Sequence, residues 1–110
     1  MLTAKQLRNL SGEEKHVLLS QCKYDGLERD LEKIEIVLKL SQICGFTSCD
    51  IVTNRLNASE KDFGLVYLMH ELKIRGYNLS FKDTNTLEID WKELVEINVQ
   101  YNQENTEHLE

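Results

Sequence analysis

The sequence contains no proline, no internal repeat and no low-complexity stretch, so nothing in it indicates a boundary between two domains. Its three cysteines are odd in number and unevenly spaced, which argues against a disulfide framework and for a reducing compartment. No apolar run approaches the ~20 residues that a bilayer span requires, and residues 1–8 lack the apolar core of an export signal. We therefore expect a single cytoplasmic domain without a membrane segment.

Charge of one sign is concentrated at one end of the chain. The formal net charge is −6, and residues 90–110 hold one basic group against six acidic ones. Residues 51–89 are balanced, with five groups of each sign. Duplex-DNA readers normally gather Lys and Arg on one face, because phosphate contacts supply most of their affinity. That footprint is missing from the sequence.

The first half of the chain predicts helices over 3–9, 12–23 and 27–44. Ser11 and Glu14 form a capping box at the start of the second of these helices. The long third helix has a core stripe at helical spacing, and polar side chains of its first half are expected to face water: Leu27, Leu31, Ile34 and Leu38 in the stripe, and Glu28, Arg29, Asp30, Glu32 and Lys33 outside it.

The second half of that helix, residues 36–40, is apolar on nearly every side, so we expect it at the centre of the core. Gly45 suits the left-handed residue that ends a helix. A short helix is predicted over 48–56, with Ile51, Val52 and Leu56 facing inward.

The sequence then predicts a helix over 60–75 that is capped by Ser59 and stopped by Gly76. Its core stripe consists of Leu65, Leu68, Met69 and Leu72. Beyond it, apolar residues alternate on both sides of a polar turn over 83–86: Tyr77, Leu79 and Phe81 before it, and Leu87 and Ile89 after it. This pattern is typical of a β-hairpin.

Residues 91–102 fit two interpretations. Trp91, Leu94 and Val95 have helical spacing, whereas Ile97 and the apolar residues after it alternate as in a strand. We expect a helix, because the segment has good helix propensity and no glycine or proline. The domain is expected to span 1–104, with 1–26 as an N-terminal helical extension. Residues 105–110 are expected to be a frayed tail, whose last two residues have the form of a cloning scar.

The order helix, glycine, short helix, capped helix, glycine, hairpin over residues 34–90 resembles the winged helix-turn-helix fold. The resemblance implies an α+β, mainly helical domain of five or six helices with one two-stranded antiparallel β-hairpin. In that family the third helix, here 60–75, presents the contact surface, and the hairpin forms the wing. Members read DNA or contact proteins, so the likeness alone fixes no activity.

The leading turn of the 60–75 helix carries two carboxylates, Glu60 and Asp62, which a phosphate backbone would repel. We therefore expect a small non-enzymatic protein-interaction or regulatory module, with a duplex-DNA-binding transcriptional regulator as the alternative. A protein partner is favoured over nucleic acid, and a homodimer stays open. The expected contact surface consists of Lys61, Tyr67, Glu71, Lys73, Arg75 and Lys82.

No pattern of catalytic residues is evident, and we expect neither a metal nor a cofactor. Cys44, Cys49 and His70 form the one metal-like grouping, but the spacing is loose and a fourth ligand is not evident. We interpret Cys22 and Cys44 as small buried hydrophobes and Cys49 as a residue near a helix start, where a lowered thiol pKa is the functional alternative. Gly64, inside a predicted helix, indicates either close local packing against the long helix or a flat patch for a partner.

Overall fold

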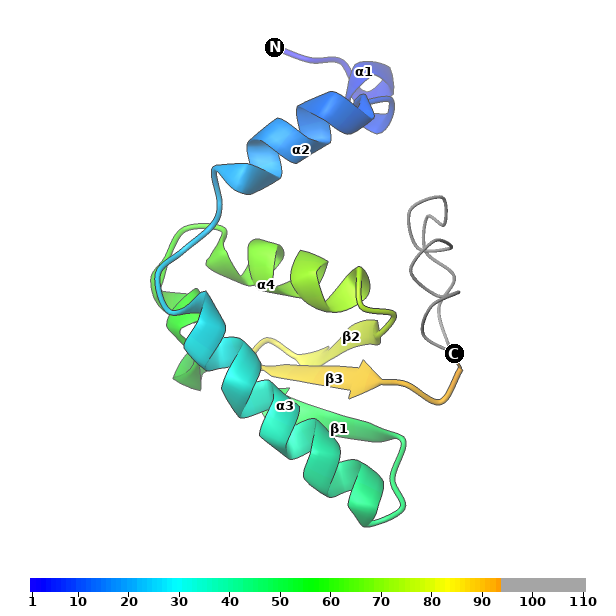
Figure 1. The fold of residues 1–110 in the computed structure, drawn as a ribbon. Coiled ribbons are helices and arrows are strands. Elements are labelled where there is room, and N and C mark those ends of the chain that lie inside the picture. Colours follow the sequence, from blue (N-terminus) through cyan, green and yellow to red (C-terminus); the bar gives the residue numbers. More distant parts are fainter. Residues whose placement is uncertain (94–110) are drawn as a thin grey trace, which may run out of the picture.

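The computed structural model describes residues 1–93, which contain four α-helices, three strands and two short 3₁₀ helices (Figure 1). The helices are α1 (Ala4–Arg8), α2 (Gly12–Ser20), α3 (Leu27–Ile43) and α4 (Gly64–Lys73). The strands are β1 (Ser48–Val52), β2 (Asn78–Asp83) and β3 (Thr86–Asp90), and the 3₁₀ helices are η1 (Thr53–Arg55) and η2 (Asn57–Glu60). None of these helices is both long and apolar enough to cross a membrane.

The strands form one antiparallel sheet in the order β1-β3-β2, so β1 and β2 are its edges. Leu87 of the central strand is opposite Ile51 on one side and Phe81 on the other. Helices α3 and α4 cover one face of this sheet, whereas α1 and α2 project away from it and bury no residue (Figure 1).

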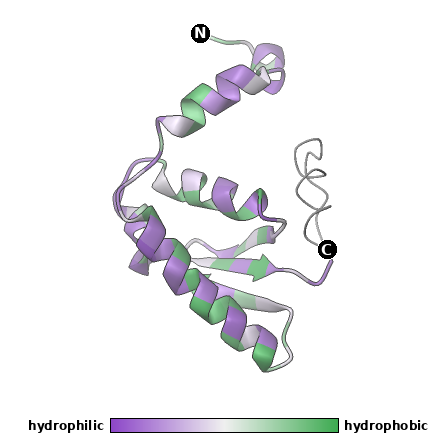
Figure 2. Ribbon diagram, viewed as in Figure 1, coloured by the Kyte–Doolittle hydropathy of each residue, from purple (hydrophilic) through white to green (hydrophobic). Residues whose placement is uncertain are grey.

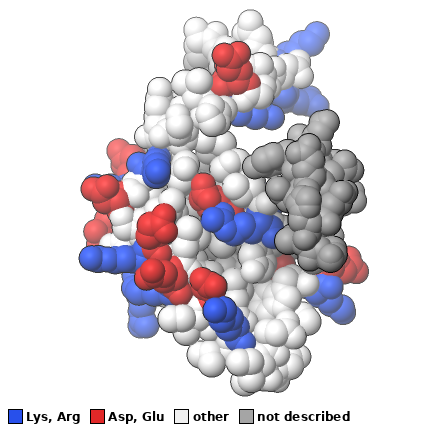
Figure 3. Space-filling view, in the orientation of Figure 1, with Lys and Arg blue, Asp and Glu red and all other residues white. Residues whose placement is uncertain are grey.

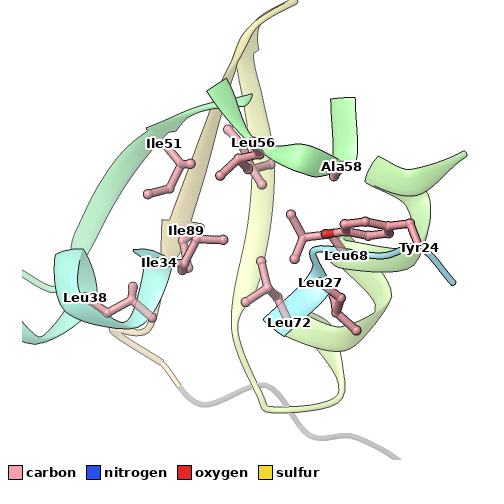
Figure 4. Close-up of a cluster of buried hydrophobic side chains, with 11 residues drawn as sticks. Tyr24, Leu27, Ile34, Leu38, Ile51, Leu56, Ala58, Leu68, Leu72 and Ile89 are labelled. Atoms are coloured by element: carbon pink, nitrogen blue, oxygen red, sulfur yellow. The ribbon is translucent and has the colours of Figure 1, made fainter. Parts of the chain in front are cut away.

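The core lies between the two covering helices and the sheet. Ile34 of α3 lies over Ile89 of β3, and Leu27 lies beside Leu72 of α4 (Figure 4). The most completely buried apolar side chains come from α3, from α4 and from the central strand β3: Ile34, Leu68, Leu72, Leu87 and Ile89. This arrangement leaves the second sheet face uncovered by any described element.

The expectation of five or six helices and a two-stranded hairpin is wrong, because the described residues hold four α-helices and a three-stranded sheet. The difference arises at 48–56, where a helix was predicted and β1 followed by η1 is found. Ile51 is buried and Cys49 half-buried, while Asp50 and Val52 are exposed, which is the alternation of a strand. Val52 therefore does not face inward as expected. The predicted hairpin is present as β2 and β3, extended by β1.

Helix α4 begins later than predicted, at Gly64, and Ser59 is not its cap. The Ser59 hydroxyl donates instead to the Leu56 carbonyl oxygen at 2.8 Å, within the turn of η2. Phe63 occupies the cap position with a left-handed φ of 60°, a conformation that is uncommon for a bulky residue.

Gly64 packs closely against η2. A Cβ atom built on it would lie 2.5 Å from the carbonyl oxygen of buried Ala58. The packing explanation for this glycine therefore fits, but the neighbour is η2 and not the long helix.

Helix α3 departs from the expected burial in both halves. Asp30, expected to face water, is fully buried, and the apolar second half exposes Ile36, Val37, Leu40 and Ile43. Only one side of α3 faces the sheet. Because the second half of α3 is apolar on nearly every side, its apolar residues on the other side stay exposed.

The buried Asp30 carboxylate accepts four hydrogen bonds, three of which join α3 to η2. Its Oδ2 accepts from the Tyr24 hydroxyl at 2.8 Å and from the Ala58 amide at 2.9 Å. Its Oδ1 accepts from the Asn57 amide at 2.9 Å and from Asn57 Nδ2 at 3.1 Å. These donors satisfy the buried charge and fix the turn that precedes α4.

Two smaller expectations concern the ends of the chain. The Ser11–Glu14 capping box is confirmed, with both reciprocal hydrogen bonds present, although α2 ends at Ser20 and not near residue 23. Residues 91–93 are not helical. The rest of the predicted 91–102 helix and the 105–110 tail lie outside the described residues.

Candidate functional site

The six residues of the expected contact surface do not form one continuous patch. Lys61, Lys73 and Arg75 are exposed on or beside α4. Tyr67 and Glu71, on the same helix, are half-buried. Lys82 lies on the other side of the sheet from α4.

The position of Lys82 follows from its ion pair. Its Nζ lies 3.0 Å from Asp50 Oδ2, so the contact crosses the central strand β3. The β3 residue between them, Glu88, is on the face opposite the buried Leu87 and Ile89. The uncovered sheet face is therefore polar and partly acidic, and it is separate from the α4 surface.

The outward side of α4 is apolar and aromatic. Phe63 is 69% exposed, Val66 49% and Ile74 46%. Half-buried Tyr67 and His70 continue the same side at helical spacing, with their rings 6.5 Å apart. These side chains lie opposite Leu68 and Leu72, which bury the inner side of the helix.

Sequence reasoning missed this outward stripe, although a signal was available. Assigning Leu65, Leu68, Met69 and Leu72 to the core leaves Phe63, Val66 and Ile74 without a place on the inner side. Residues left over in this way point to a second apolar side of a helix.

Of the three cations on or beside α4, Arg75 is paired with a carboxylate of that helix. Arg75 donates to Glu71 Oε1 at 2.8 Å and to the Glu71 carbonyl oxygen at 2.6 Å, closing a pair one turn apart. Burial and the neighbouring Glu71 carboxylate raise the pKa of Tyr67, so its phenol stays neutral. Lys61 and Lys73 have no carboxylate within salt-bridge distance in the described part of the chain. Figure 3 shows blue and red side chains interspersed over the visible face of the molecule.

A hollow of about 590 Å³ lies between the end of α3 and the turn from α4 to β2. Trp91 Nε1 donates to Gln42 Oε1 at 2.7 Å, and Tyr77 meets the Trp91 ring edge-on at 6.4 Å. The lining has a salt bridge between Lys39 and Glu35 but no nucleophile beside a base. The walls include Leu38, Ile43, Tyr77 and Trp91, which suit an apolar contact.

The cysteines do not form a site within residues 1–93. No group of three or more His, Cys, Asp or Glu residues there is placed to hold a metal ion. Cys44, expected to be buried, is exposed, and Cys22 and Cys49 are half-buried. Because Cys49 lies in a strand, no helix N-terminus activates it, and burial raises the pKa of its thiol.

No family model, curated protein or solved structure matched the chain when it was compared with each of these sets.

Proposed function

We propose that this chain is a non-enzymatic protein-interaction module that uses the outward side of α4 as its contact surface. The observation that carries the proposal is the exposed stripe of Phe63, Val66 and Ile74 on a helix whose inner side is already packed. Contiguous exposed apolar groups on a surface mark contact sites. Half-buried Tyr67 adds the aromatic character that is enriched at interface centres.

Support for the winged-helix resemblance, which we keep as part of this proposal, comes from the order of elements. In our assignment α3 supports the turns η1 and η2, α4 presents the contact side, and the β2–β3 hairpin is the wing. The strand β1 and the 3₁₀ helix η1 stand where the sequence alone indicated a short helix. These elements do not cover the outward side of α4, where Phe63, Val66 and Ile74 are exposed.

The alternative, reading of duplex DNA, has less support on this surface. Its cations are few, and Arg75 is already engaged by Glu71. Three apolar side chains stand where phosphate and base contacts would require Arg, Lys, Asn or Gln.

A photo-crosslinking amino acid placed at Val66 tests the proposal directly in cells of the source organism. We expect a discrete protein adduct that disappears when Phe63→Glu and Ile74→Glu are added. The matched control carries the same crosslinker at exposed Asn85, in the hairpin turn. Equal adducts from both positions, or none from Val66, would refute the assignment of the surface.

A gel-shift assay with random duplex DNA at low salt separates the two functions. We expect no shift at micromolar protein. Micromolar binding that weakens steeply as salt is added would favour the DNA alternative, because that slope reports released counterions.

A further inference from the structure

Strand β1 is an edge of the sheet, and within residues 1–93 no strand pairs with its outer side. The amide of Thr53 donates to the Asn85 carbonyl at 2.8 Å, and that of Trp91 donates to the Thr47 carbonyl at 2.9 Å. Because residues of an antiparallel pair alternate in the direction of their backbone groups, Cys49 and Ile51 also point towards β3. The N–H and C=O groups of Ser48, Asp50 and Val52 therefore point away from the sheet. They form the row that an additional strand would pair with.

A groove lies beside this edge, between β1 and α3. It has a volume of about 380 Å³ and an apolar lining of Ile34, Ile36, Val37, Ile51, Val52 and Leu56. Further along the chain, Leu40 and Ile43 of α3 are 58% and 78% exposed, and Phe46 is exposed just after the helix. Figure 2 shows this concentration of hydrophobic residues in the second half of α3, and Figure 3 shows uncharged surface where that helix ends.

The two ends of the groove differ in charge. Lys33 and Arg55 line the end where β1 finishes, and neither has a carboxylate within salt-bridge distance among residues 1–93. Asp50, the one acidic residue of the lining, is already paired with Lys82. This end is therefore cationic in a chain whose net charge is −6, and it complements an acidic ligand.

A second copy of the chain fits this edge poorly. Full antiparallel pairing of β1 with itself would place Asp50 directly opposite the Asp50 of the other copy, on the same face. Like charges in that position destabilise a strand pair. The one carboxylate of β1 belongs to Asp50, and Lys82 already pairs with it. Self-pairing would therefore supply no free carboxylate from β1 to Lys33 or Arg55.

We propose that the β1–α3 groove binds an extended acidic-apolar peptide segment of another protein, added as a fourth strand against β1. Its backbone pairs with Ser48, Asp50 and Val52, and alternate apolar side chains enter the groove over Val37. One or two carboxylates at one end meet Lys33 and Arg55. Main-chain pairing supplies affinity and the side chains supply specificity, as in other cases of strand addition.

The probe is a synthetic peptide, acetyl-Glu-Glu-Thr-Val-Thr-Val-Thr-amide, titrated into ¹⁵N-labelled protein. We expect shifts confined to the β1 amides and to residues 33–40 of α3. Hydrogen exchange at Asp50 and Val52 should slow when the peptide is bound. A peptide with both glutamates replaced by lysine, and one with the threonine between the two valines replaced by proline, serve as matched controls and should bind at least roughly fivefold more weakly, because that threonine carries an N–H that pairs with β1.

Charge reversal in the protein gives the second arm. Lys33→Glu with Arg55→Glu should weaken the probe by roughly five- to tenfold, as expected for two partly exposed ion pairs. Lys73→Glu, on α4, should leave the affinity unchanged and so separates this site from the α4 surface. Circular dichroism confirms that each variant is folded.

Three results would overturn the proposal: equal binding of all three peptides, shifts centred on α4, or no shift at millimolar probe. A dimer in sedimentation velocity, with β1 amides protected without the probe and unchanged by it, would assign this edge to a second copy and also overturn it. Because the α4 crosslinking experiment does not involve β1, either proposal can fail while the other stands.

Discussion

Replacing Asp30 by alanine is the most severe test of how the α3–η2 junction is held. The carboxylate is fully buried and accepts four hydrogen bonds. Without it the Ala58 amide is left buried and unpaired, at about 1–3 kcal/mol. The Asn57 amide and the Tyr24 hydroxyl lose a charged acceptor as well. Because nearby losses do not add in full, we expect a total of about 3–5 kcal/mol.

Urea unfolding followed by far-UV circular dichroism measures this loss. With an m-value of about 1–3 kcal/mol/M, the midpoint for Asp30→Ala should fall by roughly 1 M or more. Asp30→Asn keeps the shape and one acceptor oxygen, so it should cost about 2 kcal/mol and remain folded. Asp25→Ala, an exposed carboxylate in the turn just before α3, is the control and should change stability by less than about 0.5 kcal/mol. A loss below about 1 kcal/mol for Asp30→Ala would refute the view that this carboxylate joins the two elements.

Tyr24, Gly64 and the pair of cysteines Cys44 and Cys49 each give a further measurable prediction. Burial, followed by the Asp30 hydrogen bond and charge, holds the pKa of Tyr24 well above its usual value of 10.0. When folding raises the pKa of a group, the resulting stabilisation is fully present below the pKa of the unfolded state. It is lost as the pH rises from there towards the pKa of the folded state. Unfolding free energy should therefore fall above about pH 10, by up to ~1.4 kcal/mol per pH unit, and Tyr24→Phe should remove that part of the slope in urea titrations from pH 9 to 11.5. Gly64→Ala should destabilise by about 1–3 kcal/mol, because its Cβ meets the Ala58 carbonyl, whereas Gly12→Ala meets open space and serves as its control in the same assay. Exposed Cys44 should be alkylated before half-buried Cys49, whose thiol pKa is raised, and peptide mass spectrometry at pH 8 would contradict the structure if the order were reversed.

Local patterns predicted the parts of the fold that depend on near neighbours. The Ser11–Glu14 capping box needs only residues three apart, and both bonds are present. The alternation around Leu87 and Ile89 predicted paired strands, and β2 and β3 do pair there. The pattern was readable because only a short turn separates the two strands. In both cases the partners are close in sequence, so the sequence pattern contains the contact.

The wrong predictions concern contacts between distant segments. Asp30 looks like part of a solvated helix side until Asn57, 27 residues away, supplies its donors. Segment 48–56 contains apolar residues compatible with either period, and pairing with β3 decides for a strand. The apolar second half of α3 indicated burial, but nothing in one dimension shows that the sheet would cover only one of its sides.

The same limit applies to the candidate sites. Lys73 and Lys82 were grouped because the winged-helix resemblance assigns the contact surface to the third helix and the hairpin, yet the sheet separates them. The edge along β1 was invisible, since that segment was expected to be helical. Only the backbone direction of Ser48, Asp50 and Val52 shows which groups are available there.

The separation of α1 and α2 from the rest of the described chain has a thermal consequence. Each is shorter than the ~12–15 residues at which an isolated helix becomes marginal in water, and neither buries a side chain. Their helicity should therefore decline gradually on warming, well before the cooperative transition of the sheet and its two covering helices. The protein should melt with a steep pre-transition slope in ellipticity at 222 nm, and removing residues 1–20 should flatten that slope while leaving the midpoint in place.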